Sequence, residues 1–219
     1  MMNKITLYLA LGVSVILTAC GNTSTGGSTT ADAGLATPLT ANEIAGLKYM
    51  REEEELARDL YMNIYTARGS TLTIFQSISN NSEIGHAQKM LDLLNTYGET
   101  DPSTGNTMTY TDVGLQALYD QLIGTATGGA TTDLNALMVG AKVEEVDIED
   151  INAKKAQVQA AHALIIQTYD NLLCGSRNHL RSFVAQIETA TGTTYTPQIP
   201  ALAAEVTAIL AGAQEKCGR

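Results

Sequence analysis

The chain has 219 residues and a formal net charge of −10, and it contains no tryptophan and only two phenylalanines. The acidic balance argues against nucleic acid and against an anionic lipid surface as electrostatic partners. The absence of tryptophan, the scarcity of phenylalanine and the abundance of alanine, leucine and isoleucine favour a helical bundle over a β-sandwich.

The first 20 residues resemble a bacterial lipoprotein signal. Lys4 supplies a small basic region, and the apolar run that follows, residues 5–18, is too short for a permanent membrane span. The run ends in Leu17-Thr18-Ala19-Cys20, which is similar to a lipobox. We therefore expect Cys20 to be lipidated and to anchor the protein to the cell envelope, in the periplasm or on the outer surface. An ordinary secretory signal with an incidental cysteine is the alternative, and it also predicts export.

The composition after Cys20 predicts a tether followed by one domain. Residues 21–39 are rich in Gly, Ser and Thr and read as a flexible tether. Residues 40–200 are expected to form a helical bundle, and residues 201–219 a C-terminal helix and tail. Cys174 and Cys217 could form a disulfide in an oxidising compartment, or Cys174 could be a metal ligand or redox thiol; the sequence leaves this open.

Two long helices are predicted first. Thr40-Ala41-Asn42-Glu43 has the spacing of a capping box, and Gly69-Ser70 ends the apolar period that follows it. A second helix is expected over about residues 73–97 and ends at Gly98. The ionisable residues on or beside these two apolar faces are Glu54, Glu83 and His86.

Two further long helices are predicted after a connection over residues 98–132. The connection has room for a short amphipathic helix over residues 112–123. The third helix begins near Thr132 or Asp133, and the fourth ends at Gly192. No glycine or proline marks the boundary between them, and a short terminal helix is expected over residues 201–213. The ionisable residues on these faces are Glu144 and His179.

The heights of these five residues fit one site. A buried charge is costly unless it is paired or bound to metal. Height here means the position of a residue along the helix axes. In an antiparallel helix pair, two residues at the same height are separated from the connecting turn by equal numbers of residues. The midpoint between Glu54 and the Glu83/His86 pair falls at the predicted turn near residue 69. The midpoint between Glu144 and His179 places the unmarked turn at about residues 158–162.

The helix order and these turns define the predicted fold. The connection is long enough for the second and third helices to run parallel, which gives an all-α four-helix bundle with one long crossover between helices 2 and 3 and a short C-terminal helix. The ferritin-like bundles have this topology, and their di-iron proteins take one Glu from each of two helices and Glu-x-x-His from each of the other two.

Four motifs carry a resemblance to a known family. The chain is similar to the ferritin-like superfamily in its rubrerythrin-like branch, and more closely to the DUF2202 family, over about residues 43–200. The motifs are Met50–Asp59 (MREEEELARD), Ser82–His86 (SEIGH), Val143–Ile148 (VEEVDI) and Gly175–Leu180 (GSRNHL).

The resemblance implies a metal site at five positions. Glu54 matches the first-helix carboxylate, Glu83 and His86 match the second-helix pair, Glu144 matches the third-helix bridging carboxylate, and His179 matches the fourth-helix imidazole. The departure is Ser176, which stands where the second Glu-x-x-His would have its Glu. Asp147 or Glu145 could compensate, or the site could hold one metal ion. Tyr61 is expected in the core or as a hydrogen-bond donor to a ligand.

Other readings of these residues remain open. In the run of residues 52–55 only Glu54 lies on the apolar stripe, so Glu52, Glu53 and Glu55 are expected at the surface. Glu54 and Glu144 could instead form buried salt bridges with basic residues. His162 lies about 25 Å along a helix from His179, so it belongs at a turn and outside the site. The basic residues considered are Arg51, Arg58, Arg177 and Lys142.

The functional expectation is a metal-binding protein, and whether it is an enzyme stays open. Carboxylate and imidazole ligands suit one or two iron ions, with manganese or zinc as alternatives. The resemblance implies Fe(II) oxidation or the reduction of peroxide or dioxygen. The alternatives are a bundle that sequesters metal or contacts a partner without catalysis, and a scaffold that has lost its metal. The expected partners are a metal ion and, through Cys20, a membrane; nucleic acid is not expected, and a homodimer is left open.

Overall fold

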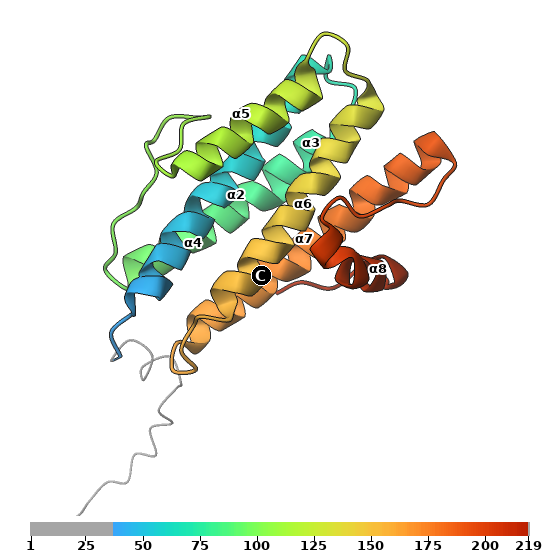
Figure 1. Cartoon of the computed structure of the whole chain (residues 1–219). Helices are drawn as coiled ribbons and strands as arrows, with labels where there is room; N and C mark the ends of the chain where they lie inside the picture. The colour runs from blue at the N-terminus through green and yellow to red at the C-terminus, as the bar shows by residue number, and fades with distance from the viewer. Residues whose placement is uncertain (1–36, 219) are drawn as a thin grey trace, which may run out of the picture.

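The computed structural model describes residues 37–218 as an all-helical protein (Figure 1). Residues 1–36 and 219 lie outside the described part, and with them the predicted signal over residues 1–20, Cys20 and most of the tether. Within residues 37–218, no helix is both long enough and apolar enough to cross a bilayer.

The first long helix, α2 (Ala41–Ala67), begins at the predicted capping box. The Glu43 backbone N–H donates to Thr40 Oγ1 at 3.2 Å, and the Thr40 N–H donates to Glu43 Oε2 at 2.8 Å. These two bonds satisfy N–H groups that the first helical turn leaves without partners. The predicted turn is also confirmed, because Gly69 and Ser70 both have a positive φ and reverse the chain there.

The prediction of one continuous α-helix over residues 73–97 is wrong in one respect. The stretch consists of α3 (Thr73–Ile78), a π-helical segment η1 (Ser79–Glu83) and α4 (Ile84–Thr96). The π-helical segment contains no glycine or proline, so the sequence pattern could not reveal it. The Ser79 hydroxyl donates to the Arg58 carbonyl at 2.9 Å and ties this segment to α2. Single π-turns inside helices are frequent at functional sites, and this one ends at Glu83.

The second half of the chain follows the predicted order. α5 (Val113–Thr127) lies in the long connection, α6 (Asp133–Lys155) is capped by Thr132, and α7 (Ala163–Thr191) ends at Gly192 with a φ of 67°. The turn that had no local signal spans residues 156–162, where the height argument placed it. A 3-10 turn η2 (Pro200–Leu202) leads into α8 (Ala203–Ala211).

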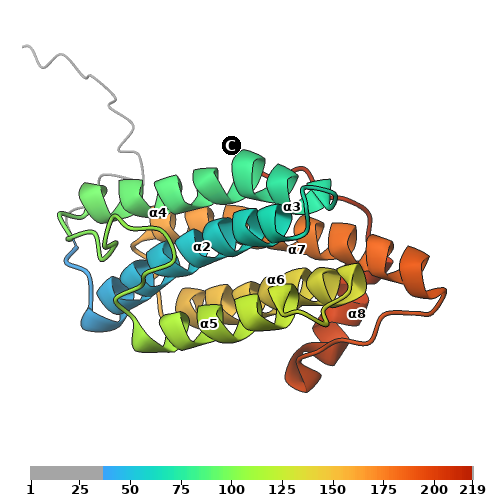
Figure 2. The ribbon, with the colours of Figure 1, turned by 90° about the horizontal axis from the view of Figure 1, so that it is seen from above.

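The long helices pack side by side in two antiparallel pairs (Figures 1 and 2). α2 pairs with α3–α4, and α6 pairs with α7. α5 runs back along α2 and α6 inside the connection, so that α4 and α6 point the same way (Figure 1). α8 folds back beside α7 at one end of the molecule (Figure 2). The faces of the long helices that meet in the middle bury the core.

The expectation that Glu52, Glu53 and Glu55 lie at the surface is wrong, since all three are buried. The chain before α5 covers this side of α2. Glu52 accepts the Asp112 N–H at 3.0 Å and so holds the start of α5 against α2. Glu55 pairs with Arg51 at 3.0 Å. The prediction of surface exposure was wrong because the apolar residues of α2 mark only one of the two helix faces that are buried.

A disulfide joins Cys174 of α7 to Cys217 in the C-terminal tail, with their Cα atoms 5.5 Å apart. The question that the sequence left open is therefore answered in favour of pairing. Cys174 has no free thiol to offer to a metal ion. The bond holds the tail against α7, where Glu215 also pairs with Arg177 at 2.5 Å.

Candidate metal centre

The five predicted residues converge between the four long elements of the bundle. Glu54 comes from α2, Glu83 from the end of the π-turn, His86 from α4, Glu144 from α6 and His179 from α7. Four of these side chains are buried, and the side chain of His179 is 13 % exposed. They form two groups of three residues, and within each group the three ligand atoms lie within 4.8 Å of one another.

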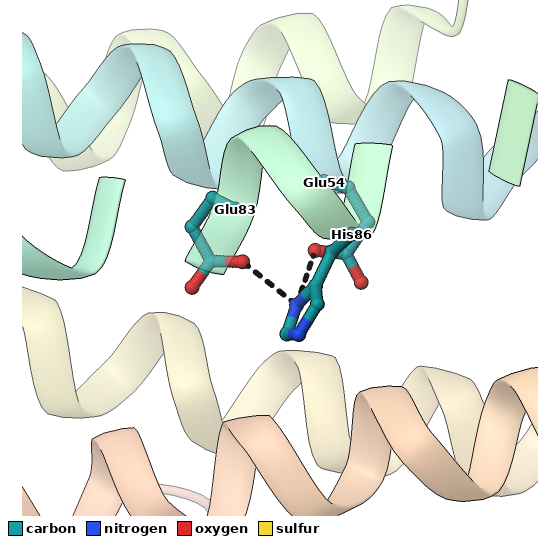
Figure 3. A group of neighbouring side chains, drawn as sticks. All are labelled: Glu54, Glu83 and His86. Carbon is teal, nitrogen blue, oxygen red and sulfur yellow. Dashed lines mark hydrogen bonds and ion pairs between the residues drawn. The ribbon is translucent and has the colours of Figure 1, made fainter. Parts of the chain in front are cut away.

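The first group consists of Glu54, Glu83 and His86 (Figure 3). His86 Nδ1 lies 3.0 Å from Glu83 Oε2 and 3.3 Å from Glu54 Oε2. Figure 3 shows both carboxylates turned toward the imidazole, one from α2 and one from the same helical stretch as the histidine. The spacing of Glu83 and His86 therefore does place both side chains on one face.

The second group consists of Glu83, Glu144 and His179. His179 Nδ1 lies 2.9 Å from Glu83 Oε1 and 3.4 Å from Glu144 Oε2. Glu83 thus gives one oxygen to each group and is their only common member. The resemblance assigned the bridging position to Glu144, whereas the carboxylate that lies between the two groups is Glu83.

Several ligand atoms are buried without a hydrogen-bond partner. Glu83 Oε1 and His179 Nδ1 are close, yet neither makes a hydrogen bond of acceptable geometry, and Glu54 Oε1 is also unpartnered. Buried polar atoms are normally hydrogen-bonded, and exceptions call for an explanation such as an ion. Carboxylate oxygens and imidazole nitrogens facing one space are a suitable donor set for a divalent cation.

The charges in this core depend on one another. Burial opposes charge on both imidazoles, but the carboxylates beside them prevail and raise the pKa of His179 to about 10 and that of His86 well above its usual value. Burial would raise the pKa of Glu83, but the two histidines hold it well below its usual range. Burial raises the pKa of Glu54 to about 7. The carboxylates of this core therefore favour a positive charge at both imidazoles.

Neighbouring side chains fix the positions of the candidate ligands. The Tyr61 hydroxyl donates to Glu144 Oε1 at 2.5 Å, which leaves Glu144 Oε2 facing His179. Gly175 of α7 lies against the ring of His86, since a Cβ at this position would stand 2.6 Å from His86 Cε1. Sequence reasoning gave Tyr61 this role as one of two options and missed the close approach at Gly175.

Ser176, the departure from the Glu-x-x-His pattern, is fully buried and contacts Asp147. Its hydroxyl lies within hydrogen-bonding distance of Asp147 Oδ2 and also donates to the Leu172 carbonyl at 2.9 Å. Asp147 Oδ1 has no hydrogen-bond partner, although the side chain is buried. Burial and the carboxylates of Glu54 and Glu144 raise the pKa of Asp147 well above its usual value.

Glu145, the other carboxylate considered as a substitute, lies elsewhere. Its oxygens accept hydrogen bonds from the Tyr195 hydroxyl at 2.8 Å and from the Ile199 N–H at 2.7 Å. Glu145 therefore holds the chain between α7 and α8, and neither group of candidate ligands includes it. Its full burial is explained by these bonds and requires no metal ion.

Three of the four basic residues considered as salt-bridge partners for the two glutamates, Arg51, Arg58 and Arg177, have other partners. Arg51 pairs with Glu55 and Asp101, and Arg58 pairs with Glu55 and Asp59. Among residues 37–218, the basic side chains within 4.0 Å of Glu54 or Glu144 are the two histidines. A buried arginine or lysine therefore does not account for either carboxylate.

His162 lies at the turn before α7, as expected, and is fully buried. Its Nδ1 contacts Glu43 Oε1 at 2.5 Å, and its Nε2 lies 3.1 Å from the Thr37 carbonyl. Burial opposes the ionisation of Glu43, but the contacts from His162, Thr40 and Gln159 lower its pKa to about 2. This pair links α2 to the turn between α6 and α7.

A cavity of about 290 Å³ opens over the histidine side of the centre. Both candidate histidines line it, together with Lys89, Asn178 and the tail residues Cys217 and Gly218. The disulfide therefore holds the C-terminal tail at the edge of this cavity. No local pattern in the sequence indicates that the tail lies there.

Comparison with known proteins agrees with this arrangement of helices. The chain is 36% identical to "Uncharacterized protein MJ0754" of Methanocaldococcus jannaschii over 162 residues, which cover 74% of this chain and 83% of that protein. The crystal structure of the hypothetical protein MJ0754 superposes with a TM-score of 0.73 at 33% identity, covering 82% of this chain and 97% of that one. The profile of a family described as "Uncharacterized protein domain (DUF2202)" matches residues 43–212. The chain therefore belongs to the DUF2202 family.

Proposed function

We propose that this protein binds two metal ions, most suitably iron, at a carboxylate–histidine centre in a ferritin-like four-helix bundle. The observation that carries the proposal is the position of Glu83, whose two carboxylate oxygens face different histidines on different helices. A carboxylate that belongs to two groups of ligands suits a pair of neighbouring metal ions better than a single ion.

Each group would hold one ion. Glu54 and His86 would complete the first position, and Glu144 and His179 the second, with Glu83 shared between them. Manganese and zinc accept the same kinds of ligand. Bound iron would supply electron transfer to dioxygen or peroxide, which is the reaction class of an Fe(II) oxidase or peroxide reductase.

The chain itself prepares the ligands and controls protons. Tyr61 fixes one oxygen of Glu144 and directs the other toward His179. Metal binding requires neutral imidazoles, so the protons that the neighbouring carboxylates hold on His86 and His179 must leave as the ions enter. The buried setting keeps bulk water away from the carboxylates, while the cavity beside the histidines admits small solutes.

Anaerobic titration with Fe(II) tests the proposal. We expect near two irons per chain, and a ligand-to-metal absorption band on exposure to air. The double variant Glu83→Ala plus His86→Ala should bind little iron, because it removes the shared carboxylate and one imidazole. Unchanged iron binding by this variant, or the absence of binding by the wild type, would overturn the proposal.

A second function, metal sequestration without turnover, is favoured by Ser176. The carboxylate that would make the two halves of the centre symmetrical is absent from α7, and Ser176 contacts Asp147 instead. This function predicts two tightly bound metal ions but no consumption of dioxygen or peroxide by the Fe(II)-loaded protein. An oxygen electrode distinguishes the two proposals on a single sample.

We also propose that the protein works at the cell envelope, because residues 1–20 resemble a lipoprotein signal. A lipid on Cys20 would hold the domain at a membrane by the tether that follows. Mass spectrometry of the mature N-terminus should find acyl chains on Cys20, and Cys20→Ser should release the protein from the membrane fraction. A mature protein that begins at another residue would refute this.

A further inference from the structure

Each histidine of the proposed centre has a second ring nitrogen that lacks the usual partner. Nδ1 of each ring faces the carboxylates of the centre. Nε2 of His86 lies 3.3 Å from the Ser82 hydroxyl, and among residues 37–218 Nε2 of His179 has no hydrogen-bond partner. A histidine that binds a metal ion almost always donates its other N–H to a carboxylate, a backbone carbonyl or water. Within the described chain, no carboxylate or backbone carbonyl is hydrogen-bonded to either Nε2.

The outer edges of the two rings open into one space. A Cβ placed on Gly175 would stand 2.6 Å from Cε1 and 2.8 Å from Nε2 of His86, and 3.8 Å from Cε1 of His179. The two rings are stacked, with their centroids 5.9 Å apart and their planes inclined by 29°. Both histidines, Gly175 and Ser82 line the cavity of about 290 Å³. One small ligand in this cavity can therefore interact with both rings.

The lining of this cavity carries no negative charge, although the chain is acidic. The net charge of the chain is −10, yet no Asp or Glu is among the described residues that line the cavity. The ionisable side chain there, besides the histidines, is Lys89, which is half-buried and has no ion-pair partner among residues 37–218. An ammonium and two imidazoles attract an anion and disfavour a cation.

We propose that this cavity binds a small oxyanion, of the size of bicarbonate or phosphate, as the missing partner of the two histidines. The inference rests on the proposed function, since a metal ion at Nδ1 leaves the proton of each neutral imidazole on Nε2 and makes that nitrogen a donor. His179 donates to the anion directly. The Ser82 hydroxyl accepts from His86 and donates its own hydrogen to the anion, whose charge Lys89 balances.

The size of the cavity and the chemistry of an oxyanion fit this arrangement. An oxyanion has several acceptor oxygens and no need of a protein acceptor, so it can serve Ser82, His179 and Lys89 together. A water molecule takes up about 30 Å³ in the liquid, so the cavity has room for the anion and several water molecules.

The anion acts on the metal centre without contacting the metal ions. An acceptor at Nε2 orients the ring and makes Nδ1 a stronger ligand, so the bound anion strengthens metal binding. By linkage, the bound metal strengthens anion binding by the same factor. The oxyanion is therefore an effector of the centre, and its place on the histidine side is separate from the carboxylates that face the metal ions.

Nuclear relaxation of inorganic phosphate (phosphorus-31) and of labelled bicarbonate (carbon-13) with the mature protein, in excess over bound Mn²⁺, tests this inference. The paramagnetic ion speeds the relaxation of nuclei held near it, so we expect a saturable enhancement for one or both anions, which also identifies the anion. Lys89→Met should raise the dissociation constant of the anion about tenfold, because it removes a charge-assisted contact, and keep the metal stoichiometry. Lys142→Met, which alters another half-buried lysine away from the cavity, should bind the anion as the wild type does.

The outcomes separate the two proposals. A wild-type protein that holds Mn²⁺ but binds neither anion, or a folded Lys89→Met variant that binds the anion as tightly as the wild type, overturns the anion site and leaves the two-metal centre intact. If Lys89→Met does not fold by circular dichroism, Ser82→Ala provides the same comparison, because it removes the hydroxyl between His86 and the anion. A wild-type protein that binds no Mn²⁺ tightly overturns the proposed function and this inference with it.

Discussion

Glu83 should be the one residue whose neutralisation removes both metal ions. In Glu83→Gln the side chain keeps its size but loses the negative charge that faces His86 on one side and His179 on the other. Glu54→Gln and Glu144→Gln each alter a carboxylate that belongs to one group only. The shared position therefore predicts a specific order of effects among three equally conservative substitutions.

The expected magnitude follows from linkage. A ligand present at 100 times its dissociation constant raises the free energy of unfolding by about 2.7 kcal/mol per site, so two sites give about 5 kcal/mol. In a domain of this size 1 kcal/mol moves Tm by roughly 2–4 °C, so saturating Mn²⁺ should raise the wild-type Tm by roughly 10–20 °C. Glu54→Gln or Glu144→Gln should retain about half of that rise, and Glu83→Gln almost none.

Differential scanning calorimetry with Mn²⁺ and with a chelator gives this rise for each variant. The rise is the relevant quantity, because Glu83→Gln also lowers the stability of the metal-free protein by removing the charge that faces two buried imidazoles. Elemental analysis should find about two, one, one and no metal ions in the wild type and the three variants. The interpretation of Glu83 as a shared ligand would be refuted if Glu83→Gln kept one ion or if Glu54→Gln lost both.

Three further predictions concern the close approach at Gly175, the Glu43–His162 pair at the end of the bundle, and the disulfide. Gly175→Ala should cost about 1–3 kcal/mol and weaken metal binding because its Cβ meets the histidine ring, whereas Gly85→Ala in open space should be neutral or slightly stabilising; urea unfolding measures both. The pKa of Glu43 is about 2, so its stabilising effect is present above pH 4.5 and lost as the pH falls through 2. Glu43→Gln should therefore lose less stability than the wild type over this interval in unfolding titrations. Replacing Cys174 and Cys217 by serine should cost about 2–4 kcal/mol and speed removal of bound metal by a chelator, as the tail beside the cavity is released.

The sequence predicted the heights of the site residues well because the rise of a helix per residue is nearly constant. Counting from the turn at Gly69 placed Glu54 level with Glu83, and the same arithmetic located the unmarked turn before α7. The capping-box spacing at Thr40–Glu43 predicted the start of α2. These are local properties, and each was visible in a stretch of a few residues.

It was harder to predict which sides of each helix are buried. The apolar stripe of α2 identified Glu54, but α2 also packs against α5, α6 and the chain before α5, so Glu52, Glu53 and Glu55 are buried as well. That second face has few apolar residues, and hydrophobic periodicity therefore could not show it. The π-turn that ends at Glu83 and the tail beside the histidines depend on contacts between distant parts of the chain, for which no local pattern exists.

Ser176 shows why a missing residue in a motif should be judged by charge as well as by position. The ferritin-like rule supplies four carboxylates and two imidazoles, and the four negative charges balance two divalent cations. Here α7 lacks its carboxylate, but Asp147 on α6 lies against the Ser176 hydroxyl and raises the count beside Glu54, Glu83 and Glu144 to four again. In this core the fourth carboxylate is therefore supplied by α6 and not by α7.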